Sequence, residues 1–204
     1  MDKAVYGLIG VVLGVFLTIV KEWWFQSRKN KKEAEFLAIQ IACMLDRFVA
    51  GCVAVAGDDG LCHGQPDENG YSSIQVDTPK FEPDIAKVEW KSLPASLMHK
   101  ALSFPNKIEV ANNRISAAFE YAATPPDYAE GFEERQLRYA ELGIEASGIA
   151  KSLRSHIGLP TNAEEEWDPL HHLTKMKAYL LELQAAREAE HSAMVANLVA
   201  SKTA

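Results

Sequence analysis

Hydrophobic positions form two patterns along the chain, a continuous apolar run near the N-terminus and a helical periodicity beyond it. The run covers residues 4–20, which carry no charged side chain and are rich in Val, Leu, Ile, Gly and Phe. As a helix these 17 residues span about 26 Å at about 1.5 Å per residue, close to the roughly 30 Å of a bilayer's hydrocarbon core. The run therefore predicts a transmembrane anchor within residues 1–25.

Aromatic and basic side chains follow this run directly. Trp gathers at membrane interfaces and long basic side chains extend to the headgroups, so we expect the helix to leave the bilayer here. The expected interface anchors are Lys21, Trp23, Trp24, Arg28, Lys29, Lys31 and Lys32. A cleavable signal peptide is the alternative, but it has a shorter apolar core and a small-residue cleavage site, where this chain has Trp-Trp-Phe. We therefore expect an uncleaved anchor.

The basic residues also predict the orientation. Five of them follow the apolar run and only Lys3 precedes it, and basic residues next to a membrane helix stay on the cytoplasmic side. We expect a single-pass protein of the inner or plasma membrane, with the N-terminus outside and the body in the cytoplasm. Gly7, Gly10 and Gly14 share one face of the helix. Small residues at this spacing let two membrane helices approach closely, which makes a homodimer through this helix a further expectation.

The body begins with one helix and one long loop. Within residues 26–57 a basic segment is followed by apolar residues every three or four positions, from Leu37 to Val55, which predicts a helix that ends at Gly57 and continues the anchor without a break. Residues 58–92 lack this periodicity, so we expect a long irregular loop. Two interpretations of the loop stay open. Alternating stretches at 73–78 and 85–90 would pair as a small β-hairpin, or the loop packs irregularly against the bundle.

Residues 93–204 supply the remaining helices. The second helix is expected to start with Ser92 as its N-cap and Pro94 in its first turn, to be disturbed at Phe104-Pro105, and to resume to about Ala123.

Start and stop signals place two more helices. A third helix is expected from Asp127, as its cap, to Gly158; Thr161 and Glu164 form a candidate capping box, and a last helix starts at Pro169. The predicted fold class is mainly α: an N-terminal transmembrane helix followed by an antiparallel bundle of about four helices with one long irregular loop.

Composition and charge narrow the function classes. The 204 residues are 48% hydrophobic, with 12 Gly, 9 Pro and 3 Cys, which excludes a fully disordered chain and a disulfide scaffold. Residues 1–32 hold six Lys/Arg and two Asp/Glu, a net charge of +4, and the remaining 15 Lys/Arg and 26 Asp/Glu give −11, in total −7. An acidic body offers no surface for phosphates, so we expect no nucleic-acid partner.

Candidate metal and catalytic residues do not form a recognisable pattern. Cys62-His63 is one adjacent pair of metal ligands, but a zinc site usually has paired ligands two to four residues apart. Cys43 and Cys52 lie nine positions apart on one helix and are expected to be core thiols. Glu188 and His191 match half of a di-iron signature whose second half is absent. We expect no metal, no cofactor and no enzymatic activity.

The favoured hypothesis for function is therefore an interaction, scaffold or sensor module tethered to the bilayer and binding an unknown protein partner. The alternatives are a membrane-anchored enzyme with an unrecognised carboxylate and His site, and a phage-type membrane accessory protein. We expect the recognition surface in or beside residues 58–92, because ordering a loop of this length needs either packing or a bound partner. Its candidate contacts are Trp90, Phe81, Tyr71 and His63.

Overall fold

The computed structural model describes residues 2–83, 90–160 and 168–203, and the side chains within 13–83, 90–160 and 168–196. These residues are mainly helical and contain no named strand. The elements are α1 (Asp2–Ala56), the short 3-10 helix η2 (Trp90–Ser92), α2 (Ala95–Tyr121), α3 (Ala129–His156) and α4 (Pro169–Thr203). The predicted mainly α class is confirmed, and the predicted end of the first helix lies at Ala56, next to Gly57.

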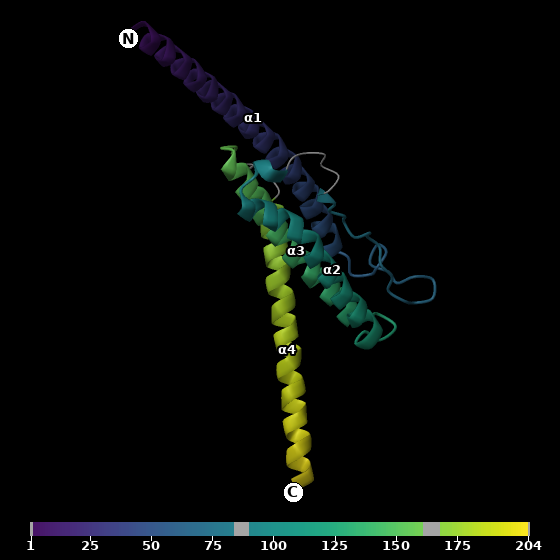
Figure 1. Ribbon diagram of the computed structural model, residues 1–204. Coiled ribbons are helices and arrows are strands. Elements are labelled where there is room, and N and C mark those ends of the chain that lie inside the picture. The colour runs from purple at the N-terminus through teal and green to yellow at the C-terminus, as the bar shows by residue number, and fades with distance from the viewer. Residues whose placement is uncertain (1, 84–89, 161–167, 204) are drawn as a thin grey trace.

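Helix α3 lies at the centre, and the other three long helices pack against it (Figure 1). Side-chain contacts give the directions. Arg154 near the end of α3 pairs with Asp46 in α1, and the hydroxyl of Tyr139 in α3 donates to Asn112 of α2 at 2.8 Å. Helix α4 starts beside the middle of α3, and Arg187 pairs with Glu133 near the start of α3.

The α2–α3 and α3–α4 pairs are therefore antiparallel, and α1 is antiparallel to α3. Helices α1, α2 and α4 all run in one direction (Figure 1). The reason lies in the long connection between α1 and α2, which carries the chain back along α1 before α2 begins.

Residues of all four long helices meet in one hydrophobic core. In α1 the core residues include Leu37, Ile41 and Leu45, which are fully buried and follow one another at helical spacing. At Gly143 of α3 an added Cβ would lie 2.6 Å from the Cδ1 atom of Leu173 in α4 and 2.9 Å from the Cβ atom of Cys52 in α1. The absence of a side chain at this one position therefore lets three helices meet closely.

Helix α1 is unbroken, but only its second half belongs to the core. Its side chains are exposed from Leu13 to Lys32, and the first buried residue is Ala34. The exposed half includes large apolar side chains, among them Phe16 at 61% and Trp23 at 73% exposure. Within the described residues, α1 from Leu13 is long and apolar enough to cross a membrane. The expectation of one continuous helix is confirmed.

Helix α2 differs from the prediction at both the N-cap and the proline. Ser92 lies in η2, and Pro94 holds the N-cap position with an extended ψ of 139°. The helix continues through Pro105 without a break. A proline inside a helix removes one hydrogen bond and destabilises it by about 3 kcal/mol. Phe104 beside it is fully buried, so tertiary packing offsets this loss.

The starts of α3 and α4 rest on different caps. Tyr128 is the N-cap of α3 and has a left-handed backbone, φ 52°, so the expected cap Asp127 lies one residue earlier. Helix α4 begins at Pro169 as predicted, and the Oδ1 atom of Asp168 accepts a hydrogen bond from the backbone N–H of Leu170 at 2.9 Å. The candidate capping box at Thr161 and Glu164 lies outside the described residues.

The long loop contains no hairpin in its described part. Residues 73–78 form no strand, and 85–89 of the expected partner stretch lie outside the described residues. An isolated antiparallel β-bridge in the described part of the loop joins Cys62 and Gln65 in a tight turn.

Candidate functional site

The long loop is fixed to the bundle at its beginning by a buried ion pair. One carboxylate oxygen of Asp58 accepts from the backbone N–H of Gly60 at 3.0 Å, and the other accepts from Gln75 and Val76 at 3.1 and 3.0 Å. That second oxygen also accepts from Arg135 of α3 at 2.8 Å, and Arg135 donates in turn to the carbonyl of Val76. Both charged side chains are at most 2% exposed. We call these five residues the Asp58 network.

The end of the described loop is fixed by apolar contacts. Phe81 is 5% exposed, and its ring packs edge-on against Phe48 of α1 and Phe104 of α2 with centroids 6.3 and 5.6 Å away. Pro79 lies against Gly51, where an added Cβ would come within 2.5 Å of its ring. The loop is therefore joined to the folded core at the Asp58 network, at Pro79 and at Phe81, and most of the residues between these points are exposed.

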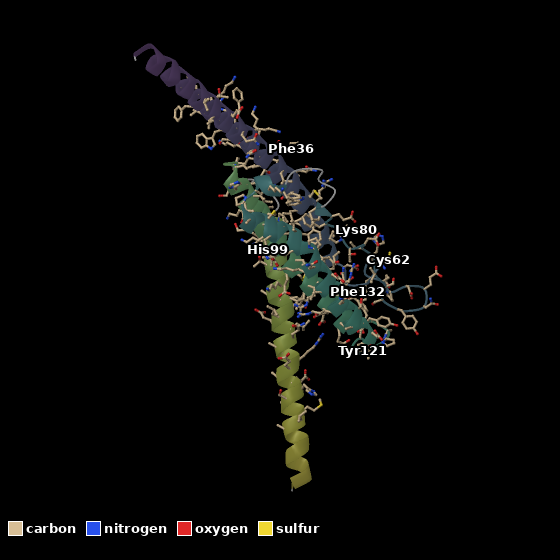
Figure 2. All side chains as sticks on the ribbon, viewed as in Figure 1. Phe36, Cys62, Lys80, His99, Tyr121 and Phe132 are labelled. Carbon is tan, nitrogen blue, oxygen red and sulfur yellow. The ribbon has the colours of Figure 1, made fainter. Side chains whose placement is uncertain are left out.

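The four candidate contact residues do not form one cluster. Phe81 is a core residue, so a partner cannot reach its ring unless the fold opens. Trp90 is half-buried against the core in η2. Tyr71 is 43% exposed with its ring 6.4 Å from that of Tyr128 at the start of α3. His63 is exposed in the turn that follows Cys62. Figure 2 shows Cys62 between Lys80 and Tyr121, on the side of the molecule where α2 ends.

A groove of about 330 Å³ between α2 and α3 is lined by five charged side chains, Lys107, Arg114, Arg138, Glu141 and Glu145. Its cations are held by neighbouring carboxylates: Lys107 pairs with Glu145, and Arg138 lies between Glu134 and Glu141 at 2.7 and 2.6 Å. These bonds raise the pKa of Arg138, chiefly through the hydrogen bond to Glu134. An anionic ligand would have to displace these carboxylates from their cations.

One cationic side chain at this groove differs from the others. Arg114 is exposed at its rim, and the structure gives it no ion pair among the described residues.

The candidate metal ligands do not gather into a site in the described part of the structure. No group of three or more His, Cys, Asp or Glu side chains lies close enough to hold a metal ion there. Cys52 is fully buried, and burial raises the pKa of its thiol. The expectation that Cys43 is also a core thiol is wrong, because Cys43 lies on the outer side of α1 and is exposed.

The first half of α1 carries the most extensive apolar surface. From Leu13 to Phe25, nine large apolar side chains are more than 40% exposed. Where this surface ends, the guanidinium of Arg28 stacks 4.0 Å from the ring centroid of Trp24, and the ammonium of Lys21 lies 5.9 Å from that of Phe25. Each cation is therefore placed over an aromatic ring at the boundary between the apolar and the charged part of the helix.

The remaining interface anchors are surface residues of the same helix. Lys29 and Lys31 make long contacts of 3.7 and 3.9 Å with Glu33 and Glu35 one turn later, and Lys32 is exposed. Gly14 faces open space, since nothing lies within 4 Å of an added Cβ. The side chains before residue 13 lie outside the description, so Gly7 and Gly10 are placed only by their positions in α1.

Comparison of the chain with protein-family models, curated proteins and solved structures finds no match in any of the three. The sequence reasoning missed the Asp58 network, which joins residues 77 positions apart. A signal for half of it was present. Arg135 lies three residues after Phe132 and four before Tyr139, and therefore on the apolar face of α3. A charged residue at such a position predicts a buried partner.

Proposed function

We propose that this chain is a single-pass membrane protein whose helical body faces the cytoplasm and serves as an interaction, scaffold or sensor module. The observation that carries the proposal is the exposed apolar half of α1. A helix that crosses a bilayer satisfies its backbone hydrogen bonds internally and needs an apolar surface on every side. Residues 13–20 meet both conditions, since they are helical and exposed throughout.

The size of this surface favours a membrane over water. Full burial of a large apolar side chain stabilises by about 1.5–3 kcal/mol. The nine side chains from Leu13 to Phe25 are each 43–73% exposed, so their insertion would contribute roughly 8–16 kcal/mol. That is comparable to the total stability of most domains, about 5–15 kcal/mol. The inner face of the second half of α1 needs no membrane, because the other helices already cover it.

The orientation is argued from charge. Lys21, Arg28, Lys29, Lys31 and Lys32 follow the apolar segment and Lys3 precedes it, which favours the cytoplasm for the body. The stacking of Arg28 on Trp24 suits an interface where the ring meets lipid and the guanidinium meets headgroups.

Membrane association is tested with two matched leucine variants. Leu17→Asp places a charge in the exposed half of α1, and Leu181→Asp places one at an exposed leucine of α4 (63% and 45% exposed). We expect the full chain and Leu181→Asp to remain in the membrane pellet after alkaline carbonate extraction and Leu17→Asp to be released. Release of the unmodified chain would contradict the anchor. An intact mass that lacks the N-terminal residues would indicate a cleaved signal peptide instead.

Protease accessibility tests the orientation. Protease added outside intact spheroplasts should leave the body whole, and detergent should make it accessible. Digestion of the body without detergent would place it on the other side of the membrane.

The partner-binding role is proposed for the exposed part of the long loop, where the Asp58 network holds the backbone in place. We expect Tyr71→Ala combined with His63→Ala to reduce the recovery of co-purified proteins from solubilised membranes. Tyr179→Ala, at a tyrosine of α4 that is 58% exposed, is the control and should leave recovery unchanged. If the unmodified chain, the double variant and Tyr179→Ala give equal recovery, the exposed loop is not the binding surface, and other faces of the bundle become the candidates.

A further inference from the structure

A second groove, of about 580 Å³, lies between the long loop and the second half of α2. We call it the loop groove. Ile74 of the loop, which is 56% exposed, lines one side, and Ile115 and Phe119 of α2 line the other. Arg135 of α3 also contributes to the lining. The volume lies within the range of about 300–1,000 Å³ that is usual for binding pockets, in which apolar side chains surround a few polar groups.

Contacts within the fold hold the loop groove in one shape. Phe119 packs edge-on against Phe132 of α3, with ring centroids 5.3 Å apart. The loop is fixed on both sides of its isoleucine, because the backbone N–H of Ser72 donates to the carbonyl of Pro126 at 3.0 Å and the residues that follow belong to the Asp58 network. A ligand therefore meets a preformed surface, which lowers the entropy lost on binding.

One hydrogen-bond donor in the lining has no partner among the described residues. The side-chain oxygen of Asn112 accepts from the hydroxyl of Tyr139 at 2.8 Å, which leaves the amide nitrogen of the same side chain available. An amide nitrogen donates to carbonyl oxygens, and every residue of a peptide presents one on its main chain. The groove therefore offers apolar contacts for a side chain and a donor for a peptide backbone.

The surroundings of the loop groove are acidic. Residues 58–78 contain five Asp/Glu and residues 115–131 contain three, and neither segment contains Lys or Arg. Asp58 is neutralised by Arg135, whereas Glu120 lines the groove and has no ion pair among the described residues. This charge would repel an anionic ligand and attract Lys or Arg side chains.

Basic side chains on neighbouring elements do not cancel this charge. Arg114 lines the other groove, between α2 and α3. Arg187 of α4 is held by Glu133 at the start of α3. Lys80 follows Pro79, which lies against α1. The ligand that complements the loop groove is therefore both apolar and cationic.

We propose that the loop groove binds a short basic segment of a partner protein, with one apolar side chain between Ile74 and Phe119 and a neighbouring Lys or Arg beside Glu120. The proposal rests on the proposed function, because it assigns the chemistry of the partner that the exposed loop recruits. Tyr71 comes three residues before Ile74 and is 43% exposed. Its ring is therefore available for a cation–π contact with a second basic side chain.

Peptide selection tests the chemistry of the partner. The full chain, purified in a neutral detergent, is offered a library of short random peptides on beads. We expect the retained peptides to contain Leu, Ile, Met or Phe next to Lys or Arg. Retention of acidic peptides, of basic peptides without an apolar residue, or of no peptide above background would overturn the proposal.

A matched pair of tryptophan variants tests the place of binding, with a retained peptide as the labelled probe. Ser116→Trp fills the loop groove from α2, and Ala117→Trp places the same ring on the next residue, outside the lining; both positions are exposed. The affinity should fall about tenfold in Ser116→Trp, because the apolar side chain of the peptide loses its place. Ala117→Trp should bind as the unmodified chain does. Equal affinities of the two variants would overturn the groove as the binding site.

A second pair of variants tests the charge. Glu120→Lys reverses the charge in the groove, and Glu182→Lys makes the same change at an exposed position of α4. The affinity should fall about fivefold in Glu120→Lys, because one surface ion pair becomes repulsive, and remain nearly unchanged in Glu182→Lys. Equal losses in both would show that the net charge of the body, and not the groove, attracts the peptide.

The groove and the proposed function fail separately in this design. Peptide affinity is measured on the purified chain, and recruitment by the recovery of co-purified proteins. If Ser116→Trp changes neither quantity while Tyr71→Ala with His63→Ala reduces recovery, the groove is overturned and the recruiting loop stands. If peptide affinity falls in Ser116→Trp while recovery is the same in every chain, the groove stands and the recruiting role of the loop is overturned.

Discussion

Replacing Asp58 by Ala removes one carboxylate that accepts hydrogen bonds from three backbone N–H groups and from Arg135. Arg135 would then keep its contact with the carbonyl of Val76 but lose its counter-charge, at 2% exposure. Breaking a buried ion pair by removing one partner destabilises by about 3–5 kcal/mol. The free energy of unfolding should fall by about this amount, a fifth or more of a typical total of 5–15 kcal/mol.

The chain offers a matched control for this change. Asp46 also pairs with an arginine of α3, Arg154, but its side chain is 46% exposed. An exposed ion pair contributes at most about 1 kcal/mol, so Asp46→Ala should have a small effect. Asp58→Ala combined with Arg135→Met should be less destabilising than Asp58→Ala alone, because the unpaired buried charge is removed as well.

The assay is urea unfolding of the full chain in detergent, followed by circular dichroism. For a slope of about 2–3 kcal/mol per molar urea, Asp58→Ala should lower the midpoint by about 1–2 M and Asp46→Ala by less than about 0.5 M. A second measurement is the rate of trypsin cleavage at Lys80, which is exposed on the same loop and should become faster in Asp58→Ala. Equal midpoints for the two alanine variants would refute the buried network.

Two further predictions concern packing and pH. Gly143→Ala should lower the free energy of unfolding, because its Cβ would overlap Leu173, whereas Gly148→Ala in the same helix meets open space and should raise it by about 0.5–1 kcal/mol; urea midpoints of the two variants decide this, and equal midpoints would contradict the close contact. Burial raises the pKa of Cys52, so its contribution to stability is complete below the unfolded-state pKa of about 8.5 and declines as the pH rises above it. Midpoints measured from pH 7 to 10 should therefore fall above about pH 8.5, and the fall should be shallower in Cys52→Ala; the same slope in both chains would contradict a buried protonated thiol.

Local signals in the sequence were sufficient for most helix boundaries. Glycine ends α1 and follows α3, and Pro169 starts α4, because these residues act on the backbone within one or two positions. Periodicity also separated the two faces of α1. The core face from Leu37 to Val55 did not contain Cys43, so the pattern itself argued against the general tendency of cysteine to be buried.

The features that could not be predicted depend on contacts between distant segments. The pairing of Asp58 with Arg135 brings together a loop and a helix that no local rule connects. Pro105 was expected to interrupt α2, but the neighbouring Phe104 packs with Phe48 and Phe81 and holds the helix together. The candidate contact Phe81 illustrates the same limit, because an aromatic residue in a loop has no local feature that distinguishes a binding residue from a core residue.

The unbroken course of α1 has a mechanical consequence. From Phe25 to Ala56 the helix is about 46 Å long, at about 1.5 Å per residue, and it has no hinge between the exposed half and the buried half. A rotation of the exposed half by about 10°, well within the range of tilts of membrane helices, would therefore displace the far end of α1 by about 8 Å. Through α3, the same movement would reach α4, which extends beyond the bundle at the opposite end of the molecule (Figure 1). Because α1 is one unbroken helix, a small change of its angle at one end therefore produces a large displacement at the other end.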